Sequence, residues 1–402
     1  MWLMEVIMIV APKFRGFICT TSHPVGCEYN VRQQVEYIKK QKKIDGAKKV
    51  LVLGASTGYG LSSRITAAFG CDAATIGVFF ERPASGNRTA SAGWYNSAAF
   101  EKISKEEGLY AKSINGDAFS NEIKEQTIEM IKKDLGKIDM VIYSLASPRR
   151  THPVTGEVFN SVIKPIGPAY TSKTVDFHTQ QVSEITIEPA NDDEVRQTIA
   201  VMGGEDWEMW LDALKNADVL EDNVITLAYS YVGPDMTHDV YREGTIGRAK
   251  DHLEATAAKI TDSLKDIGGK AYVSVNKAVV TQSSAAIPVI SLYISTLFKI
   301  MKQDNIHEGC IEQMYRMFND RLYPRNLKLD YKGRICMDDW EMRSDVQVQV
   351  TKLWNEANNE NVKDISDIDG YRQEFFKLFG FEFDSIDYDA EVDIDVKIES
   401  IK

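Results

Sequence analysis

The chain has 402 residues, of which 44% are apolar and 26% are charged, a composition that supports a full hydrophobic core and excludes a disordered protein. Its 59 acidic residues outnumber its 47 basic ones, and the net charge of -12 would repel a nucleic-acid backbone, so we expect no nucleic-acid partner. The five cysteines are scattered without a CxxC pair, which predicts reduced thiols in a cytoplasmic protein and no metal site.

The segment 278–298 carries no charged residue and on length alone could span a bilayer. It contains several serines and threonines as well as Pro288, which favour a buried strand end followed by a core helix. We therefore expect no membrane anchor. The first ten residues lack a basic leader and a cleavage site, so we expect no signal peptide either.

The first part of the chain alternates compact apolar runs with amphipathic stretches. The pattern predicts, in order, a strand over 49–55, a helix over 60–69, a strand over 73–80, a helix over 94–107, a strand over 109–115, a helix over 119–134 and a strand over 139–146. Such alternation is typical of an α/β protein with a doubly wound, Rossmann-type parallel sheet that carries helices on both faces.

The pattern changes over 151–190, where short β-rich pieces around Thr155-Gly156 and Pro165 to Pro168 predict a small insertion of β-hairpins. The alternation then resumes with helices over 191–201 and 204–217, a strand over 224–232, a helix over 247–266 and a strand over 270–277. The rest is predicted to be helical, with a short strand at 334–337 and an acidic tail or edge strand at 384–395. We expect one large domain over 1–402, in which the helical region 281–402 covers the substrate.

A glycine-rich turn, Gly54 to Gly60, follows the first predicted strand and opens a helix. Glycines there let backbone N-H groups approach a pyrophosphate closely at the helix N-terminus. Glu81 ends the second strand, where a carboxylate accepts both hydroxyls of an adenosine ribose. Because that carboxylate would repel a 2'-phosphate, NAD(H) is favoured over NADP(H), although Arg82 and Arg88 lie close in sequence.

Two further strand ends should line the same cofactor, because ligands of such sheets bind at the carboxyl ends of the strands. They bring in Asp117 and Ala118 after the third strand and Ser144 to Ala146 after the fourth. Asp117 could equally be the N-cap of the following helix.

A tyrosine and a lysine follow the strand over 224–232. Tyr231 lies at its carboxyl end, and Tyr241 and Lys250 come next. On one continuous helix these two would point to opposite faces, so we expect Thr245 to cap a helix that carries Lys250 and Tyr241 to precede it. An ammonium beside a phenol favours the phenolate, which would suit proton donation to a developing oxyanion. Arg248 is a rival cation.

Many segments together resemble the trans-2-enoyl-CoA reductase and FabV-type enoyl-ACP reductase family, enlarged relatives of the short-chain dehydrogenase/reductases. The resemblance covers nearly the whole chain and includes TSHPVGC, VLVLGASTGYG, SRITAAFG, YSLASP, EPAND, MGGEDW, the Tyr-x8-Lys pair, HLEAT, SVNKAVVT, IPVISLY, HEGCIEQ and DGYR. It implies NADH-dependent reduction of the double bond of a trans-2-enoyl thioester, with crotonyl-CoA to butyryl-CoA as the expected reaction of lipid metabolism.

The resemblance also assigns roles to residues. Tyr241 and Lys250 match the catalytic pair, with Tyr241 as proton donor, and Tyr231 matches a substrate contact. The cofactor contacts that it implies are Gly54, Ala55, Ser56, Thr57, Gly58, Tyr59, Phe80, Glu81, Asp117, Ala118, Leu145, Ala146, Lys250, Val279, Val280 and Thr281. Glu81 matches the position that discriminates NADH from NADPH.

Three alternatives stay open. The thioester carrier could be acyl carrier protein, as in an enoyl-ACP reductase of fatty-acid synthesis; an acidic carrier needs a basic docking patch, for which Arg149, Arg150, Lys164 and Lys173 are candidates. A carbonyl reductase could use the same phenol to protonate an alkoxide. A non-catalytic NAD-sensing module would need the glycine turn but not the Tyr/Lys pair. We expect a monomer, because the insertions and the C-terminal third would cover surfaces that smaller relatives use for assembly.

Overall fold

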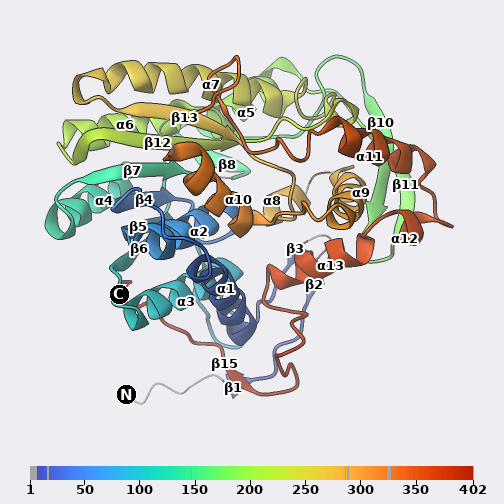
Figure 1. Cartoon of the computed structure of the whole chain (residues 1–402), viewed down its shortest axis with the longest axis horizontal. Coiled ribbons are helices and arrows are strands. Elements are labelled where there is room, and N and C mark those ends of the chain that lie inside the picture. Colours follow the sequence, from blue (N-terminus) through green and yellow to red (C-terminus); the bar gives the residue numbers. More distant parts are fainter. Residues whose placement is uncertain are drawn as a thin grey trace.

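The computed structural model describes residues 7–15, 18–145, 147–285, 287, 289–323 and 327–401. A seven-stranded sheet of order β14-β13-β12-β7-β4-β5-β6 runs through its centre, and all its paired strands are parallel (Figure 1). The order reverses between β4 and β7, which defines a doubly wound Rossmann-type sheet and confirms the predicted fold class. The strands are β4 (Lys49–Leu53), β5 (Ala74–Phe79), β6 (Ala111–Asn115), β7 (Ile138–Tyr143), β12 (Leu220–Ser230), β13 (Lys270–Val275) and β14 (Ile335–Cys336).

Helices cover both faces of the sheet because its strands are apolar on both sides. Leu51 and Leu53 of β4 pack into one buried cluster with α4 (Asn121–Asp134), α6 (Glu205–Asn216) and α7 (Thr245–Ser263). Val50 and Val52 point the other way, into a larger cluster. That second cluster takes in α9 (Ile290–Gln303), α10 (Cys310–Arg316), α11 (Ser344–Glu356) and α13 (Ile368–Lys377).

Three further helices form a smaller cluster beside β4 and β5. They are α1 (Pro24–Lys39), α2 (Gly58–Ile65) and α3 (Ala92–Glu106). Helix α1, whose N-cap is His23, is not among the elements predicted from the sequence. The predicted helix over 60–69 is α2 continued by a wider π-helical turn over Thr66–Gly70, all of whose residues are buried.

The insertion holds two hairpins. In the first, β8 (Arg149–Thr151) and β9 (Val158–Asn160) flank the predicted Thr155-Gly156 turn, and Gly156 has a positive φ of 73°. In the second, β10 (Tyr170–Asp176) pairs with β11 (Gln181–Ile187), so its turn lies over 177–180. The β-rich hairpin piece predicted around Pro165 to Pro168 is not observed, because that segment only connects β9 to β10. Helix α5 (Asp192–Met202) follows and packs against α7.

The C-terminal third is helical, as predicted, with α8 (Gln282–Ala285), α9, α12 (Val362–Ile365) and α13, and β14 is the expected short strand. Within the described part of 278–298 the expected strand end is wrong, because β13 already ends at Val275. The expected core helix is confirmed, since eleven residues of α9 are buried. No helix in the described ranges is both long and apolar enough to cross a bilayer.

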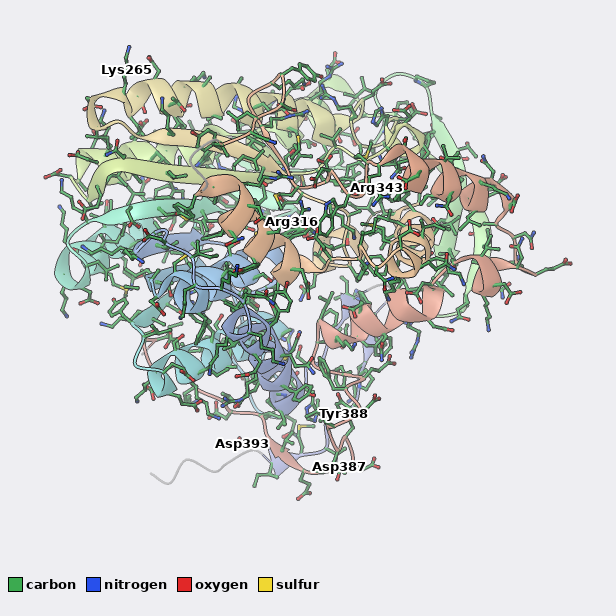
Figure 2. All side chains as sticks on the ribbon, viewed as in Figure 1. Lys265, Arg316, Arg343, Asp387, Tyr388 and Asp393 are labelled. Carbon is green, nitrogen blue, oxygen red and sulfur yellow. The ribbon has the colours of Figure 1, made fainter. Side chains whose placement is uncertain are left out.

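The acidic tail returns to the body of the protein. Its short strand β15 (Val392–Asp393) pairs with β1 (Ile7–Met8), as an edge strand. Asp393 belongs to this pair and Tyr388 lies near it, on the side of the molecule away from α6 and α7 (Figure 2). Beyond β15, the backbone carbonyls of Ile394 and Val396 accept hydrogen bonds from Tyr95 and Trp94 of α3, both at 2.8 Å. The tail is therefore packed onto α3 through specific hydrogen bonds.

Candidate active site

The glycine turn between β4 and α2 has the close backbone packing that a phosphate-binding turn requires. Gly54 has a φ of 84°, and a side chain there would place Cβ 2.2 Å from the carbonyl oxygen of Ser144. A Cβ on Gly60 would lie 1.9 Å from the carbonyl oxygen of Gly54. The N-cap of α2, Thr57, makes no capping bond through its side chain. The first amide groups of α2 are thus left for an anionic ligand, and the turn fits a dinucleotide pyrophosphate.

Glu81 is held in the place predicted for an acid that binds ribose hydroxyls. Its carboxylate accepts hydrogen bonds from Ser56 of the glycine turn (2.7 Å) and from Ser91 (2.5 Å). A Cβ on Gly93 would lie 2.0 Å from Oε1 of Glu81, so the glycine leaves room for the carboxylate. The neighbouring Phe80 is 78% exposed, which leaves its ring free to stack on a ligand.

The end of β6 lies beside Glu81. The amide of Gly116 donates to the carbonyl oxygen of Phe79 (2.8 Å), which brings Asp117 and Ala118 next to the end of β5. The N-cap of α4 is Ser120, whose hydroxyl accepts from the amide of Ile123, so the alternative assignment of Asp117 as this cap is wrong. Leu145 follows β7, whereas Ala146 lies outside the described residues.

Tyr241 is buried next to Tyr231. The two rings meet edge to face with their centroids 5.0 Å apart. As predicted, Tyr241 precedes the helix that carries Lys250. The expectation that Thr245 caps that helix is wrong: the N-cap is Gly244, and the hydroxyl of Thr245 donates to the carbonyl oxygen of Val162 (2.6 Å) instead.

Lys250 points back to the sheet, where its ammonium group donates to the carbonyl oxygen of Tyr229 (3.1 Å), and burial lowers its pKa to about 8. Arg248, the rival cation, is mostly exposed and lies 3.9 Å from Asp251. No hydrogen bond joins the described side chains of Tyr241 and Lys250.

The electrostatics of Tyr241 differ from the expectation. Burial raises the pKa of its phenol, and Tyr371 and Glu341 act in the same direction. The expectation that the ammonium of Lys250 favours the phenolate is therefore wrong for this structure, because the desolvation of a buried phenolate is the larger effect. Tyr241 is protonated at neutral pH, which is the form that donates a hydrogen bond.

The segment after β13 completes the site on the side of the glycine turn. Val279 and Val280 are buried, and the side chain of Thr281 lies next to Gly58, since a Cβ on that glycine would be 3.7 Å from Cγ2 of the threonine. The hydroxyl of Thr281 accepts from the amide of Ser284 (3.0 Å). The structure therefore brings the residues predicted after β13 to the glycine turn.

Glu341 is the residue of this region that the sequence analysis missed. Its fully buried carboxylate accepts hydrogen bonds from the hydroxyls of Tyr231 (3.0 Å) and Tyr293 (2.6 Å) and from the amide of Ala278 (2.7 Å). Burial raises its pKa, and the nearby ammonium of Lys277 opposes that shift. Its position just beyond β14 is the one signal in the sequence that could have identified it, because ligands of such sheets bind beyond the carboxyl ends of the strands.

The Rossmann-type sheet, the glycine turn and the acid after the second strand define a dinucleotide-binding oxidoreductase. Three family models match the chain: the NAD(P)H binding domain of trans-2-enoyl-CoA reductase over residues 9–86, the trans-2-enoyl-CoA reductase catalytic region over 88–323, and the enoyl reductase FAD binding domain over 329–392. The chain belongs to the trans-2-enoyl-CoA reductase family, as the resemblance implied.

Individual relatives agree with this assignment. The chain is 82% identical over 394 residues to the NADH-dependent trans-2-enoyl-CoA reductase of Ruminiclostridium cellulolyticum, covering 98% of this chain and all of the relative. It is 65% identical to an NADH-dependent enoyl-[acyl-carrier-protein] reductase of Flavobacterium johnsoniae, again over 98% of this chain and all of the relative. The crystal structure of the Clostridium acetobutulicum trans-2-enoyl-CoA reductase with NADH is 45% identical, with a TM-score of 0.95 over 97% of this chain and all of that one.

The third family model carries flavin in its description, but the residues of 329–392 do not fit that group. A dinucleotide site needs a glycine turn between a strand and a helix. Here Gly370 lies inside α13, where its amide donates to the capping carboxylate of Asp367. A Cβ on Gly380 would lie 2.5 Å from the carbonyl oxygen of His23, so that glycine serves the contact with α1. The segment 329–392 therefore does not provide the glycine turn of a flavin dinucleotide site.

The four candidates for a basic docking patch are not all free to bind a partner. Arg150 is buried and pairs with Glu205 (2.6 Å), and Lys164 pairs with Glu194 (2.6 Å). Lys173 donates to the backbone carbonyls of residues 355 and 357. Arg149 is exposed. Three of the four side chains are thus engaged within the fold.

Proposed function

We propose that this chain reduces the carbon-carbon double bond of trans-2-enoyl thioesters with NADH, and that crotonyl-CoA to butyryl-CoA is its principal reaction. The observation that carries the proposal is the buried, protonated Tyr241 packed against Tyr231 at the carboxyl end of β12, in a sheet whose glycine turn fits a dinucleotide. The family membership and the names of the full-length relatives support the same reaction.

The chain's own residues supply binding, orientation and a proton. The free amides of α2 hold the pyrophosphate, and Glu81 accepts the hydroxyls of the adenosine ribose. When bound, NADH supplies the hydride that adds to the β-carbon of the substrate. Tyr241 donates a hydrogen bond to the thioester oxygen as negative charge develops there and gives its phenolic proton to the resulting enolate. The proton ends on the α-carbon, and a proton from solvent restores the phenol. One such donor typically lowers the barrier by about 3 kcal/mol.

Lys250 belongs to the same proposal as a group that holds the nicotinamide ribose. Its stem runs from α7 to the end of β12, where the ammonium already bonds the carbonyl of Tyr229. The residues Val279 to Thr281 would contact the nicotinamide end from the other side. Glu81 makes the site selective for NADH, since its carboxylate repels a 2'-phosphate.

Coenzyme A is the proposed carrier of the acyl group. The engagement of Arg150, Lys164 and Lys173 within the fold leaves no free basic patch from these candidates for an acidic carrier protein. The name of the Flavobacterium johnsoniae relative makes acyl carrier protein the alternative carrier. A cytoplasmic, monomeric enzyme in one domain is part of the proposal, and the five free cysteines are typical of a reducing compartment.

The experiment that tests the function is identification of the product. The purified protein is incubated with NADH and crotonyl-CoA, and the thioester is analysed by mass spectrometry. Butyryl-CoA, two hydrogens heavier than the substrate with the thioester intact, is the expected product. Release of free coenzyme A together with an aldehyde or alcohol would show carbonyl reduction and overturn the proposal.

A further inference from the structure

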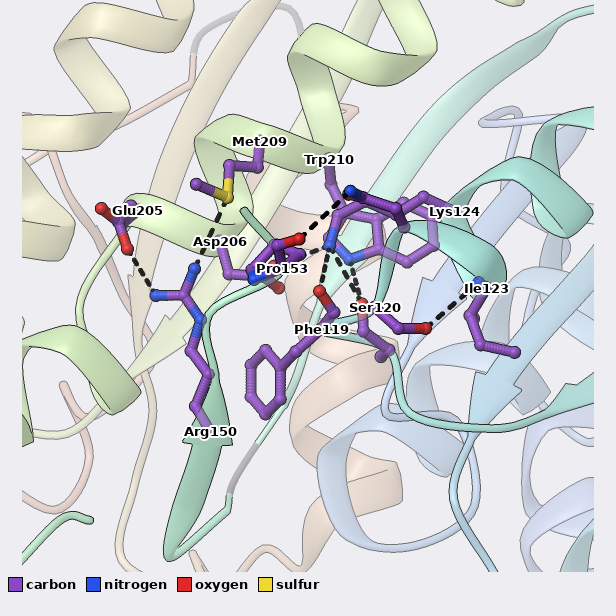
Figure 3. Close-up of polar contacts among 12 residues, drawn as sticks. Phe119, Ser120, Ile123, Lys124, Arg150, Pro153, Glu205, Asp206, Met209 and Trp210 are labelled. Carbon is purple, nitrogen blue, oxygen red and sulfur yellow. Dashed lines mark hydrogen bonds and ion pairs between the residues drawn. The ribbon is translucent and has the colours of Figure 1, made fainter. Parts of the chain in front are cut away.

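The motif MGGEDW (residues 202–207) has no part in the chemistry described above. The structure places its aspartate, Asp206, in the first turn of α6, where it is almost fully buried and pairs with Lys124 of α4 at 2.8 Å (Figure 3). The hydroxyl of Tyr143, at the end of β7, donates to the other carboxylate oxygen of Asp206 (3.1 Å). This buried pair therefore joins α4, α6 and the central sheet.

Lys124 also bonds the loop that leads from β6 to α4. Its ammonium donates to the carbonyl oxygens of Ala118 (3.2 Å) and Phe119 (3.1 Å), so all three of its donors are used within the protein. The indole of Trp210, which Figure 3 labels, donates to the same carbonyl of Ala118 (3.0 Å). Lys124 of the following helix and Trp210, which is distant in the sequence, thus fix the backbone of this loop from the inside.

This loop belongs to the adenosine end of the cofactor site. Glu81, which is placed to accept the adenosine ribose, bonds Asn115 of β6 through its backbone amide (2.7 Å), and Asp117 follows two residues later. Glu81 and the loop are thus held to the same two strand ends. A displacement of the Ala118 carbonyl would shift Asp117 relative to Glu81 without touching the nicotinamide end.

Stability alone does not account for a buried pair of this kind. Desolvation lowers the pKa of Lys124 and raises that of Asp206, which shows that each charge is costly to bury. Replacing a buried ion pair by apolar side chains is often neutral or stabilising for a protein. We propose that Lys124 and Asp206 are positioning residues that hold the Asp117–Phe119 loop in the geometry that binds the adenosine half of NADH.

The test compares the binding of a ligand that contains the adenosine half of NADH with the binding of one that lacks it. It rests on NADH as the cofactor, but it measures binding and not turnover, so its failure is separate from failure of the proposed reaction. The variant Lys124→Met/Asp206→Leu removes both charges and leaves the loop carbonyls without the ammonium. We expect its Kd for NADH, measured by fluorescence, to rise about tenfold, the equivalent of one or two lost hydrogen bonds. The Kd for reduced nicotinamide mononucleotide, which lacks the adenosine, should stay within about twofold.

A control ion pair joins the two elements that flank the loop, β6 and α4, at their far ends. Lys112 of β6 pairs with Asp134 of α4 at 2.7 Å, away from the loop. The variant Lys112→Met/Asp134→Leu should bind both ligands as the unmodified chain does. Thermal unfolding of all variants shows whether each is folded at the assay temperature.

A second variant keeps the test decisive if the double replacement does not fold. Trp210→Phe keeps a ring in the core and removes the other donor to Ala118, and we expect its Kd for NADH to rise about threefold. An unchanged Kd for NADH in folded Lys124→Met/Asp206→Leu, or in Trp210→Phe, would overturn the proposal. An equal loss of affinity for NADH and the mononucleotide would also overturn it, because that result means general distortion of the site.

Discussion

The hydroxyl of Tyr231 donates a 3.0 Å hydrogen bond to the buried carboxylate of Glu341, and the ring of the same tyrosine packs edge-on against Tyr241. A residue from the segment beyond β14 thereby fixes the neighbour of the proposed proton donor. The second hydroxyl on that carboxylate, from Tyr293, comes from α9. The C-terminal third thus contributes side chains that shape the site from within.

The variant Glu341→Gln tests this relationship. An amide cannot accept all three hydrogen bonds, because its NH2 group would face a donor, so Tyr231 or the amide of Ala278 loses its partner. We expect kcat with crotonyl-CoA to fall by about tenfold to a hundredfold, the cost of losing a hydrogen bond to a charged group. The effect should be smaller when Tyr231→Phe is already present, since the two residues act as a unit.

Glu308→Gln is the control for Glu341→Gln. Glu308 is a second buried carboxylate near Lys277, but it bonds Arg316 (2.7 and 2.8 Å), whose side chain lies in the middle of the molecule (Figure 2). The Glu308→Gln variant should be less stable than the unmodified chain and keep its kcat. Equal losses of kcat in the two variants would contradict a specific role for Glu341.

Tyr241→Phe removes the proposed proton donor and keeps its ring. Turnover should fall by about a hundredfold or more, because one oxyanion donor contributes about 3 kcal/mol. The Kd for NADH should be nearly unchanged. Tyr272→Phe, a partly buried tyrosine of β13, is the control that should retain activity. Near-normal turnover of Tyr241→Phe would remove this tyrosine from the mechanism.

Glu81→Ser should change the choice of cofactor. Loss of the carboxylate ends its repulsion of a 2'-phosphate, so we expect the ratio of kcat/KM for NADPH to that for NADH to rise by at least about tenfold. Glu101→Gln is the control, since Glu101 lies on α3 and bonds Ser400 of the tail. An unchanged ratio in Glu81→Ser would place the discrimination elsewhere.

Because two lysines are buried, we expect the free energy of unfolding to rise with pH above neutrality. Burial lowers the pKa of both Lys250 and Lys277 to about 8, whereas an unfolded lysine titrates near 10.4. Between these values the unfolded chain binds more protons than the folded chain, so the free energy of unfolding rises with pH. Lys250→Met should be more stable than the unmodified chain at pH 7, and its advantage should shrink by pH 9.5. Denaturant unfolding at both pH values measures this, and a constant difference would contradict it.

Variants of two residues in 278–298 test whether this apolar segment lines the acyl chain of the substrate or only forms part of the core. Ile287 is 7% exposed and Leu292 is fully buried, and both belong to the large apolar cluster. Leu292→Ala should lose about 2 to 5 kcal/mol of stability. If Ile287 lines the acyl site, Ile287→Ala should raise kcat/KM for hexenoyl-CoA relative to crotonyl-CoA. Loss of stability in both variants with an unchanged chain-length preference would support the core interpretation.

Local features predicted the sheet and one half of the site. The β-branched run of β4, the glycines after it and the acid at the end of β5 each follow from short-range physics, and all three lie where expected. The turn of the second hairpin could not be predicted, because it contains neither glycine nor proline. In this turn Asp176 accepts hydrogen bonds from the amides of His178 and Thr179, and Gln180 takes a positive φ of 57°.

The contacts that the sequence could not predict join distant residues. Glu341 and Ala278 are 63 positions apart, and Lys124 and Asp206 are 82 apart, so no spacing rule connects them. The pKa of Tyr241 was missed for a related reason, because desolvation depends on the packed core and not on the neighbouring lysine in the sequence.

The initial rate of NADH oxidation by the purified protein with crotonyl-CoA is the decisive measurement for the enoyl reductase activity. It is measured beside NADPH with the same thioester and beside NADH with crotonyl-acyl carrier protein, all at equal concentrations. We expect fast turnover with NADH and crotonyl-CoA and much slower turnover in the other two reactions. Turnover with the carrier protein alone would contradict coenzyme A as the carrier, and no turnover with either thioester would contradict the enoyl reductase function itself.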